Sequence, residues 1–281
     1  MSHRCQRRGA AVAEFSAAAG GPAPAFTAPV VDFAAATSLA LPLDFEALHP
    51  RHFGAPAARS EPYRTGAFNG EVARGASCNC RRVTLVPHCN GTHTESASHL
   101  TVEQRPLQEL LPVAPMRALL LSVAPVAAAG SGEDSVPAPQ PGDRLITREA
   151  LLAAWHPHCG RGPPALLLRT GTDWRDAAPP FLSRQCAAEL VARGVEHLVT
   201  DLPSLDRLQD AGRLTAHRIF FGLPAGTVRL ADAMRPTATI TELAGFPAAL
   251  RDGPCAVQIQ IPAWSGDAVP SRPLHLPLLH A

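Results

Sequence analysis

Three continuous apolar segments of strand length constrain the fold of this chain more than any other feature. They are MRALLLSVAPV (116–126), PALLLRTG (164–171) and VEHLVTDLP (195–203). Runs of this kind are typical of strands that are buried on both faces. Helix-like segments lie between them: one follows Thr147 as its N-cap, and another, SRQCAAELVARG, ends at Gly194. The alternation predicts an α/β or α+β fold formed by one domain.

Strand-like segments also predominate towards both ends of the chain. We expect strands in APVVDFA (28–34), RRVTLVPH (81–88), TATITEL (237–243) and CAVQIQIPA (255–263), and a helix around TAHRIFFG (215–222). Residues 50–80 carry many Gly, Pro and Arg residues with little periodicity, which predicts a loop. Residues 1–24 are rich in Ala, Gly and Pro and are predicted to form a flexible tail. The folded domain is therefore expected to span residues 25–281.

The charge balance excludes several classes of partner. The chain has 281 residues, with 25 basic and 24 acidic side chains. A net charge of +1 gives no electrostatic footprint for nucleic acid or for an anionic membrane. No run of about 18 apolar residues is present, and the first residues lack the apolar core of a secretory signal. We therefore expect a cytoplasmic protein with a small-molecule substrate. All basic residues are Arg, which excludes Schiff-base chemistry on lysine.

The segment HCNGTHTESASH (88–99) gathers ligand-type side chains within a short stretch. His88, His93, Glu95 and His99 offer the imidazole nitrogens and carboxylate oxygens that Zn²⁺ and Mn²⁺ accept. His93 and Glu95, two apart on an extended segment, point to the same side, and Gly91 suits a tight bend. On spacing alone, the segment is as compatible with a solvated polar loop as with one wall of a metal site.

This segment resembles the H-x-G-T-H-x-D-x-P-x-H signature of the cyclase family of metal-dependent hydrolases, which includes bacterial kynurenine formamidase. Gly91, Thr92, His93 and His99 match the signature, and Glu95 stands in place of its Asp. Three later segments, TDLPSLD (200–206), AHRIFFG (216–222) and ITEL (240–243), resemble family segments in the same order. The resemblance therefore extends over residues 28–281.

The sequence departs from the signature at its first histidine. Cys89 occupies that position, and His88 lies one residue early. Either a local bulge lets His88 reach the metal, or Cys89 replaces it as a ligand; we predict His88, because it keeps the nitrogen donor of the family. Ala97 also replaces the usual Pro.

The resemblance implies a swivelling β/β/α fold and a site that binds one or two ions of Zn²⁺ or Mn²⁺. His93 and Glu95, with His88, would hold the principal ion, and His217 and Glu242 would belong to a second. His99 would be a proton shuttle or a ligand of the second ion. Taken alone, His217 would be a helix-surface histidine and Glu242 a polar residue at a strand end. The implied activity is hydrolysis of a small amide, formamide or cyclic substrate, as in the arylformamidase of tryptophan catabolism, by a homo-oligomer.

Two other functions fit the sequence. One is a non-catalytic binding protein that keeps the fold with a degenerate metal site, as the displaced first histidine suggests. The other is a thiol-linked function of Cys78, Cys80 and Cys89, which lie near the histidine segment. Asp201, Ser204 and Asp206 are predicted to be structural, because their side chains can fix the turn after a buried strand.

Overall fold

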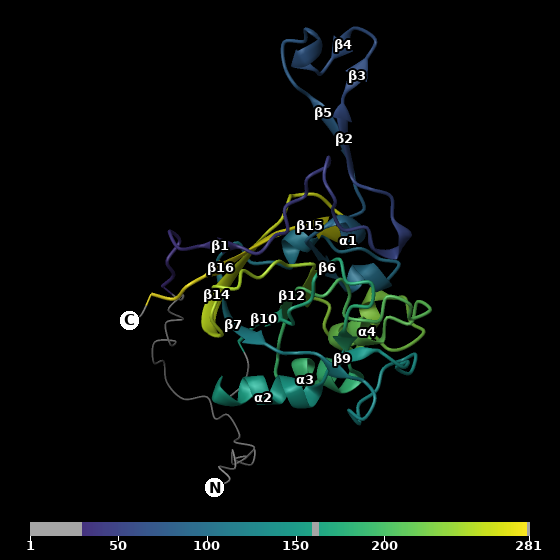
Figure 1. Ribbon diagram of the computed structural model, residues 1–281, viewed down its shortest axis with the longest axis vertical. Helices are drawn as coiled ribbons and strands as arrows, with labels where there is room; N and C mark the ends of the chain where they lie inside the picture. The colour runs from purple at the N-terminus through teal and green to yellow at the C-terminus, as the bar shows by residue number, and fades with distance from the viewer. Residues whose placement is uncertain (1–29, 159–162, 280–281) are drawn as a thin grey trace, which may run out of the picture.

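A single nine-stranded mixed sheet forms the centre of the molecule (Figure 1). The structure is a computed structural model that describes residues 30–158 and 163–279, so the predicted tail of residues 1–24 lies outside the described residues. In order across the sheet, the strands are β1 (Thr37–Ser38), β16 (Arg272–Leu276), β14 (Gly253–Gln260), β7 (Met116–Ser122), β10 (Ala165–Arg169), β12 (His197–Thr200), β13 (Thr239–Glu242), β6 (His93–Ser96) and β15 (Ala268–Pro270). The four strands from β7 to β13 are parallel, and the strands on either side of them pair antiparallel.

The parallel strands are buried on both faces, as their unbroken apolar sequence predicts. In β10, Leu166 and Leu168 pack into the hydrophobic cluster that includes the helices, whereas Leu167 packs into a second cluster. Because successive strand residues point to opposite faces, the two clusters lie on opposite sides of the sheet. The fold is thus a mixed α+β arrangement, which confirms the predicted class.

Three helices contribute to the first cluster: α2 (Arg148–Trp155), α3 (Arg184–Ala192) and α4 (Thr215–Phe221). The N-caps Thr147 and Ser183 accept hydrogen bonds from the third residue of α2 and α3, as expected for capping hydroxyls. In Figure 1, α2 and α3 lie together below the sheet. A small three-stranded sheet is formed by β8 (Val126–Ala127), β9 (Arg144–Ile146) and β11 (Phe181–Leu182). The other helical segments are short: α1 (Pro87–Asn90) and the single-turn helices η1 (His52–Gly54), η2 (Val72–Arg74), η3 (Ala97–Leu100), η4 (Leu107–Glu109), η5 (His156–His158) and η6 (Leu230–Asp232).

The sheet curls so that its first edge strand lies near the end of β13. Ala40, just after β1, forms a β-bridge with Ala244, just after β13. The backbone N–H of Gly245 also donates to the carbonyl of Leu39. These contacts bring the N-terminal segment alongside the carboxyl end of β13, where the candidate site lies.

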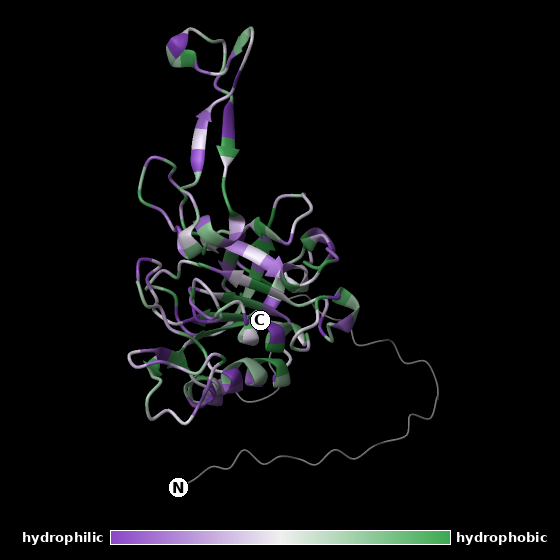
Figure 2. Ribbon diagram, turned by 90° about the vertical axis from the view of Figure 1, so that its right-hand side faces the viewer, coloured by the Kyte–Doolittle hydropathy of each residue, from purple (hydrophilic) through white to green (hydrophobic). Residues whose placement is uncertain are grey.

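Residues 59–84 form an arm that projects from the body of the molecule (Figures 1 and 2). It consists of two antiparallel pairs, β2 (Arg59–Pro62) with β5 (Arg81–Thr84) and β3 (Arg64–Thr65) with β4 (Phe68–Asn69). The prediction of a loop over residues 50–80 was therefore wrong for this part. The predicted strand in RRVTLVPH does form, but as β5 it belongs to the arm rather than to the main sheet, and all four of its residues are exposed.

The expected strand over residues 28–34 does not form as predicted. Within its described part, Val31 makes only an isolated bridge with Leu278. Asp32 then turns the chain, because its side chain accepts hydrogen bonds from the backbone of Ala34 and Ala35. Among residues 30–158 and 163–279, no helix has both the length and the apolar character needed to cross a membrane.

Candidate metal centre

The centre is built where the carboxyl end of β13 pairs with the beginning of β6. In the antiparallel register of these strands, Glu242 lies opposite His93. Glu95 follows His93 by two residues, and the donor atoms of both come within 4.8 Å of a Glu242 oxygen. His93 and Glu95 thus point to the same side, as the strand alternation predicts. All three side chains are buried.

His217 enters the centre from the first turn of α4, and Asp206 fixes its position. The Asp206 carboxylate accepts hydrogen bonds from the backbone N–H groups of Ala216 and His217. It also lies 2.7 Å from Nδ1 of the His217 ring. Nε2 of the same ring is 3.1 Å from Glu95 Oε1 and 3.3 Å from Glu242 Oε1. Asp206 therefore does more than the structural role predicted for it, because it also orients a histidine of the centre.

His88 reaches the centre from α1, a short helix rather than the strand end that the sequence suggested. Its Nδ1 atom is 3.0 Å from Glu95 Oε2, and its Nε2 atom is 2.7 Å from Asp267 Oδ2. The His99 ring lies 4.2 Å from the His88 ring, and its Nδ1 atom is 3.7 Å from the same Asp267 oxygen. Asp267 is thus a member of the cluster that sequence reasoning missed. It follows Gly266 in a loop, with no neighbouring ligand-type residue to mark it.

All six residues that the sequence proposed as ligands come together in the fold. The ligand atoms form two groups, His88–Glu95–His99 and His93–Glu95–Glu242, each within 4.8 Å. Glu95 is common to both groups, and His217 contacts both glutamates. Neither group of described residues includes Cys89, which is buried next to His88 and whose thiol pKa burial raises. Cys78 and Cys80 lie on the projecting arm and are exposed.

The pKa values in the centre shift in the direction opposite to the effect of burial alone. Burial lowers the pKa of His88, but the hydrogen bond to Asp267 and the negative charges of Glu95 and Asp267 raise it to about 10. Burial likewise lowers the pKa of His217, yet Glu95, Asp206 and Glu242 hold it well above its ordinary value. Burial raises the pKa of Glu95, but the nearby His99 and His217 hold it well below its ordinary value. The surroundings therefore favour positive charge on His88 and His217 and negative charge on Glu95.

Several buried polar atoms of the centre lack hydrogen bonds. They are His93 Nε2 and both carboxylate oxygens of Glu95. The Glu95 oxygens lie at ion-pair distance from imidazole nitrogens, but not with the geometry of a hydrogen bond. Buried polar atoms usually have hydrogen-bond partners, and a buried carboxylate without them is costly unless a cation compensates it. The nitrogen and oxygen donors present here fit a divalent ion such as Zn²⁺ or Mn²⁺.

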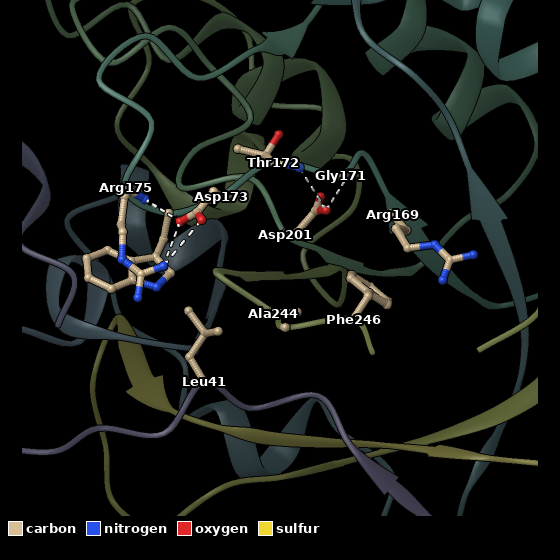
Figure 3. Close-up of a pocket in the computed structure, with 11 residues that line it drawn as sticks. Leu41, Arg169, Gly171, Thr172, Asp173, Arg175, Asp201, Ala244 and Phe246 are labelled. Carbon is tan, nitrogen blue, oxygen red and sulfur yellow. Dashed lines mark hydrogen bonds and ion pairs between the residues drawn. The ribbon is translucent and has the colours of Figure 1, made fainter. Parts of the chain in front are cut away.

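A separate cavity of about 370 Å³ lies at the carboxyl ends of β10 and β12 (Figure 3). Asp201 on its wall accepts hydrogen bonds from the backbone of Thr170, Gly171 and Thr172, in agreement with the structural role predicted for it. Arg175 lies over the Trp174 ring and is paired with Asp173. None of the six candidate ligands lines this cavity.

A comparison with known protein families identifies the family of this chain. The Cyclase family model matches residues 23–207, which is more than half of the sequence. The chain belongs to the Cyclase family. This finding confirms the resemblance seen in the signature segment. A search of curated proteins found no match.

Solved structures share the fold of this cyclase-family chain at low sequence identity. Isatin hydrolase A from Labrenzia aggregata, bound to benzyl benzoate, is 17% identical with a TM-score of 0.58, over 87% of this chain and 94% of that chain. Isatin hydrolase A from Ralstonia solanacearum is 14% identical with a TM-score of 0.55, over 86% and 91%. A protein of Bacillus stearothermophilus described as a predicted metal-dependent hydrolase is 16% identical with a TM-score of 0.55, over 86% and 97%. The cyclase fold is therefore established for this chain, as the sequence predicted.

Proposed function

We propose that this cyclase-family chain is a metal-dependent hydrolase that cleaves the C–N bond of a small amide, formamide or cyclic amide. The observation that carries the proposal is the convergence of four histidines and two glutamates, from the five elements α1, β6, η3, α4 and β13, on one buried cluster. Structures of the same fold include isatin hydrolases, which supports hydrolysis of a cyclic amide. An arylformamidase-like activity is the form of this chemistry that the signature segment favours.

The chain offers donors for one or two ions. His93, Glu95 and Glu242, joined by His217, would hold one ion, and His88, Glu95 and His99 would hold a second. Glu95 belongs to both groups and would be a ligand for either ion. When bound, a divalent ion of the Zn²⁺ or Mn²⁺ type supplies Lewis-acid polarisation of a carbonyl and a water with a pKa near neutrality.

The remaining contacts of the centre orient its donors. In the arrangement that suits a metal ligand, Nδ1–H of His217 donates to Asp206 and leaves Nε2 free as the donor atom. Asp267 similarly holds His88 through Nε2, so that Nδ1 faces Glu95. These carboxylate–histidine pairs fix both ring orientation and tautomer, and they raise the basicity of the nitrogen that remains.

His99 is the residue we assign to proton transfer. Its side chain is a quarter exposed, whereas His93 and His217 are almost fully buried. A ring at the solvent side of the cluster can deliver a proton to the leaving nitrogen of the amide and recover it from water. Its Nδ1 atom lies 3.7 Å from a carboxylate oxygen of Asp267. Ligation of the second ion is the other role open to His99.

Elemental analysis combined with a small substrate panel tests the proposal. The purified chain, never exposed to chelator, is expected to carry close to one or two equivalents of a transition metal. It should hydrolyse at least one member of a panel of formamides, cyclic amides and lactones. Metal content below a tenth of an equivalent, with no uptake from added Zn²⁺ or Mn²⁺, would exclude a metal-dependent hydrolase. Metal binding without any hydrolysis would favour the non-catalytic binding protein.

A further inference from the structure

Another cavity, of about 690 Å³, lies beside helix α4, which packs against α3 (Figure 1). Its walls are the start of α3, one face of α4 and the loops on either side of α4, residues 212–213 and 222–226. On α4, Arg218 and Ile219 line this cavity, whereas His217 contacts the glutamates of the metal centre. The cavity and the centre therefore use different faces of one helix. Its volume is within the range of small-molecule sites, about 300–1,000 Å³.

The cavity has an excess of positive charge. Three arginines line it, Arg184, Arg213 and Arg218, and no described Asp or Glu residue does. Arg184 is paired with Asp134 at 3.3 Å, with both side chains about half exposed. Within residues 30–158 and 163–279, neither Arg213 nor Arg218 pairs with a carboxylate; the Arg218 guanidinium donates to backbone carbonyls instead. Two positive charges at this cavity are thus left without a negative partner.

The cavity of Figure 3 shows that this excess is not a general property of hollows on this chain. Two arginines line that cavity as well. Arg169 is paired with Asp252 at 2.9 Å, and Arg175 with Asp173 at 3.2 Å. Both charges there are neutralised within the protein. The cavity beside α4 therefore differs by its charge, which favours an anionic ligand.

The segment that carries Arg213 is held in a fixed conformation. The buried carboxylate of Asp210 accepts hydrogen bonds from the backbone N–H groups of Gly212 and Leu214, at 2.8 and 2.6 Å. Ala211 and Leu214 have φ of 57° and 48°, the left-handed region that residues with a side chain avoid. Such backbone strain persists only where the surroundings impose it. Asp210 is thus engaged with the backbone, and it presents the exposed Arg213 side chain at the cavity.

The remaining wall of the cavity is apolar. It includes Val136, Ile219, Leu223 and Met234. The Met234 side chain is 81% exposed, while its backbone N–H donates to the carbonyl of Gly222. A flexible thioether held at a rim in this way can adapt to apolar ligands of different shape. Apolar surface beside unpaired guanidinium groups suits a molecule that is apolar at one end and negatively charged at the other.

We propose that this cavity is a second ligand site, which binds a small organic acid through its carboxylate and its apolar group together. The carboxylate faces Arg213 and Arg218, since a guanidinium donates two parallel hydrogen bonds to a carboxylate. The apolar group packs against Ile219, Leu223 and Met234. The site goes beyond the proposed hydrolase function and does not depend on it, because none of the six candidate metal ligands lines the cavity.

Three probes separate the two parts of the ligand. 1-Naphthoate carries the rings and the charge, 1-acetonaphthone carries the rings without the charge, and acetate carries the charge without the rings. Isothermal titration calorimetry of the Zn²⁺-loaded protein near pH 7 gives Kd for each. 1-Naphthoate should bind at least about tenfold more tightly than either other probe, the size expected for one charge-assisted hydrogen bond or for burial of an aromatic group. The Kd should be the same for the metal-free protein, because the site is separate from the metal centre.

Two variants and a matched control locate the binding. Arg213→Gln should weaken 1-naphthoate binding about tenfold and leave 1-acetonaphthone binding unchanged. Met234→Gln keeps the length of an exposed side chain but removes apolar surface, and it should weaken 1-naphthoate binding about two- to fourfold. Arg175→Gln removes an exposed arginine from the cavity of Figure 3, and it should have no effect.

Each other outcome refutes the assignment. The site is absent if the wild type does not bind 1-naphthoate, or if Arg213→Gln binds it as tightly as the wild type. Binding that is lost with the metal but insensitive to Arg213→Gln places the acid at the metal centre. Equal affinities for 1-naphthoate and 1-acetonaphthone refute the anionic ligand class. Absence of 1-naphthoate binding, combined with an oligomeric state that Arg213→Gln alters in analytical ultracentrifugation, makes this face a subunit interface instead.

Discussion

His197 and His217 are both buried, yet they lie at opposite ends of the parallel strands β12 and β13. His197 begins β12, where Nδ1 lies 2.9 Å from the Thr239 hydroxyl, and burial lowers its pKa to about 4. His217 lies at the carboxyl end of the strands, where Glu95, Asp206 and Glu242 raise its pKa despite complete burial. Burial by itself favours a neutral imidazole. The three carboxylates around His217 reverse that preference. The carboxyl end of the strand pair is therefore suited to a cation, whereas the end that holds His197 has a neutral, packed histidine.

Removal of a metal-binding side chain at the carboxyl end of strands β12 and β13 should reduce activity more than any other change. His217→Ala and Glu242→Gln are each expected to lower kcat/KM on the order of 10³-fold or more, beyond the 10- to 100-fold typical of outer partners of a metal site. Each should also lower bound metal, as measured by elemental analysis. The far-UV circular dichroism should stay unchanged, because these groups face the centre rather than the hydrophobic clusters. Full activity in either variant would contradict a centre shared by both halves of the chain.

The two ends should also differ in the pH dependence of stability of the metal-free protein. His197 has a folded pKa of about 4, below the unfolded value of 6.5. Its contribution to the free energy of unfolding is therefore fully present above pH 6.5. That contribution is lost as pH falls towards 4, by about 3 kcal/mol at most. His88 has a folded pKa of about 10, so its contribution is present below pH 6.5 and is lost as pH rises towards 10.

Urea unfolding of the metal-free chain between pH 4 and 10 measures both effects. His197→Asn keeps a polar group near Thr239 but cannot titrate, so it should flatten the acidic side of the profile and leave the alkaline side unchanged. His88→Asn should flatten the alkaline side only. If each variant kept the wild-type profile, the contrast between the two ends of the strands would be wrong.

The smallest expected effects distinguish His88 from Cys89 as a metal ligand. His88→Ala is expected to weaken Zn²⁺ binding at least about 10- to 100-fold, because that is the loss typical of an outer partner and His88 lies among the ligand atoms. Cys89→Ser should change it less than about twofold, since the Cys89 thiol is outside both ligand groups and burial disfavours its thiolate. Calorimetric titration with Zn²⁺ compares the two directly. The reverse ranking would make Cys89 the first ligand.

The strands and helices of the body could be predicted because local signals agree with the tertiary structure. The apolar run that forms β10 is buried on both faces, and the Thr147 hydroxyl caps helix α2. The apolar pattern and the capping residue were therefore sufficient to predict these two elements. The segments containing His217 and Glu242 were found only through the family resemblance. Locally, one is a helix with a histidine and the other a strand that ends in a glutamate.

The residues that were missed acquire their role only from long-range contacts. Asp267 is adjacent in space to His88 but distant in sequence, and a lone aspartate after Gly266 carries no pattern. Strands β2, β3 and β4 of the arm were missed because their sequences show no apolar alternation; cross-strand backbone pairing holds them instead.

The position of β6 in the sheet has a consequence for how the protein matures. This strand comes early in the chain, but its two neighbours, β13 and β15, come late. During synthesis from the N-terminus, His93 and Glu95 therefore have no strand partners until most of the chain has been made. Pairings of such high contact order form slowly, after the loop-closure entropy has been overcome. The His93–Glu95–Glu242 group is therefore complete only after β13 has paired with β6, late in folding, and an ion held by this group would be taken up at that stage.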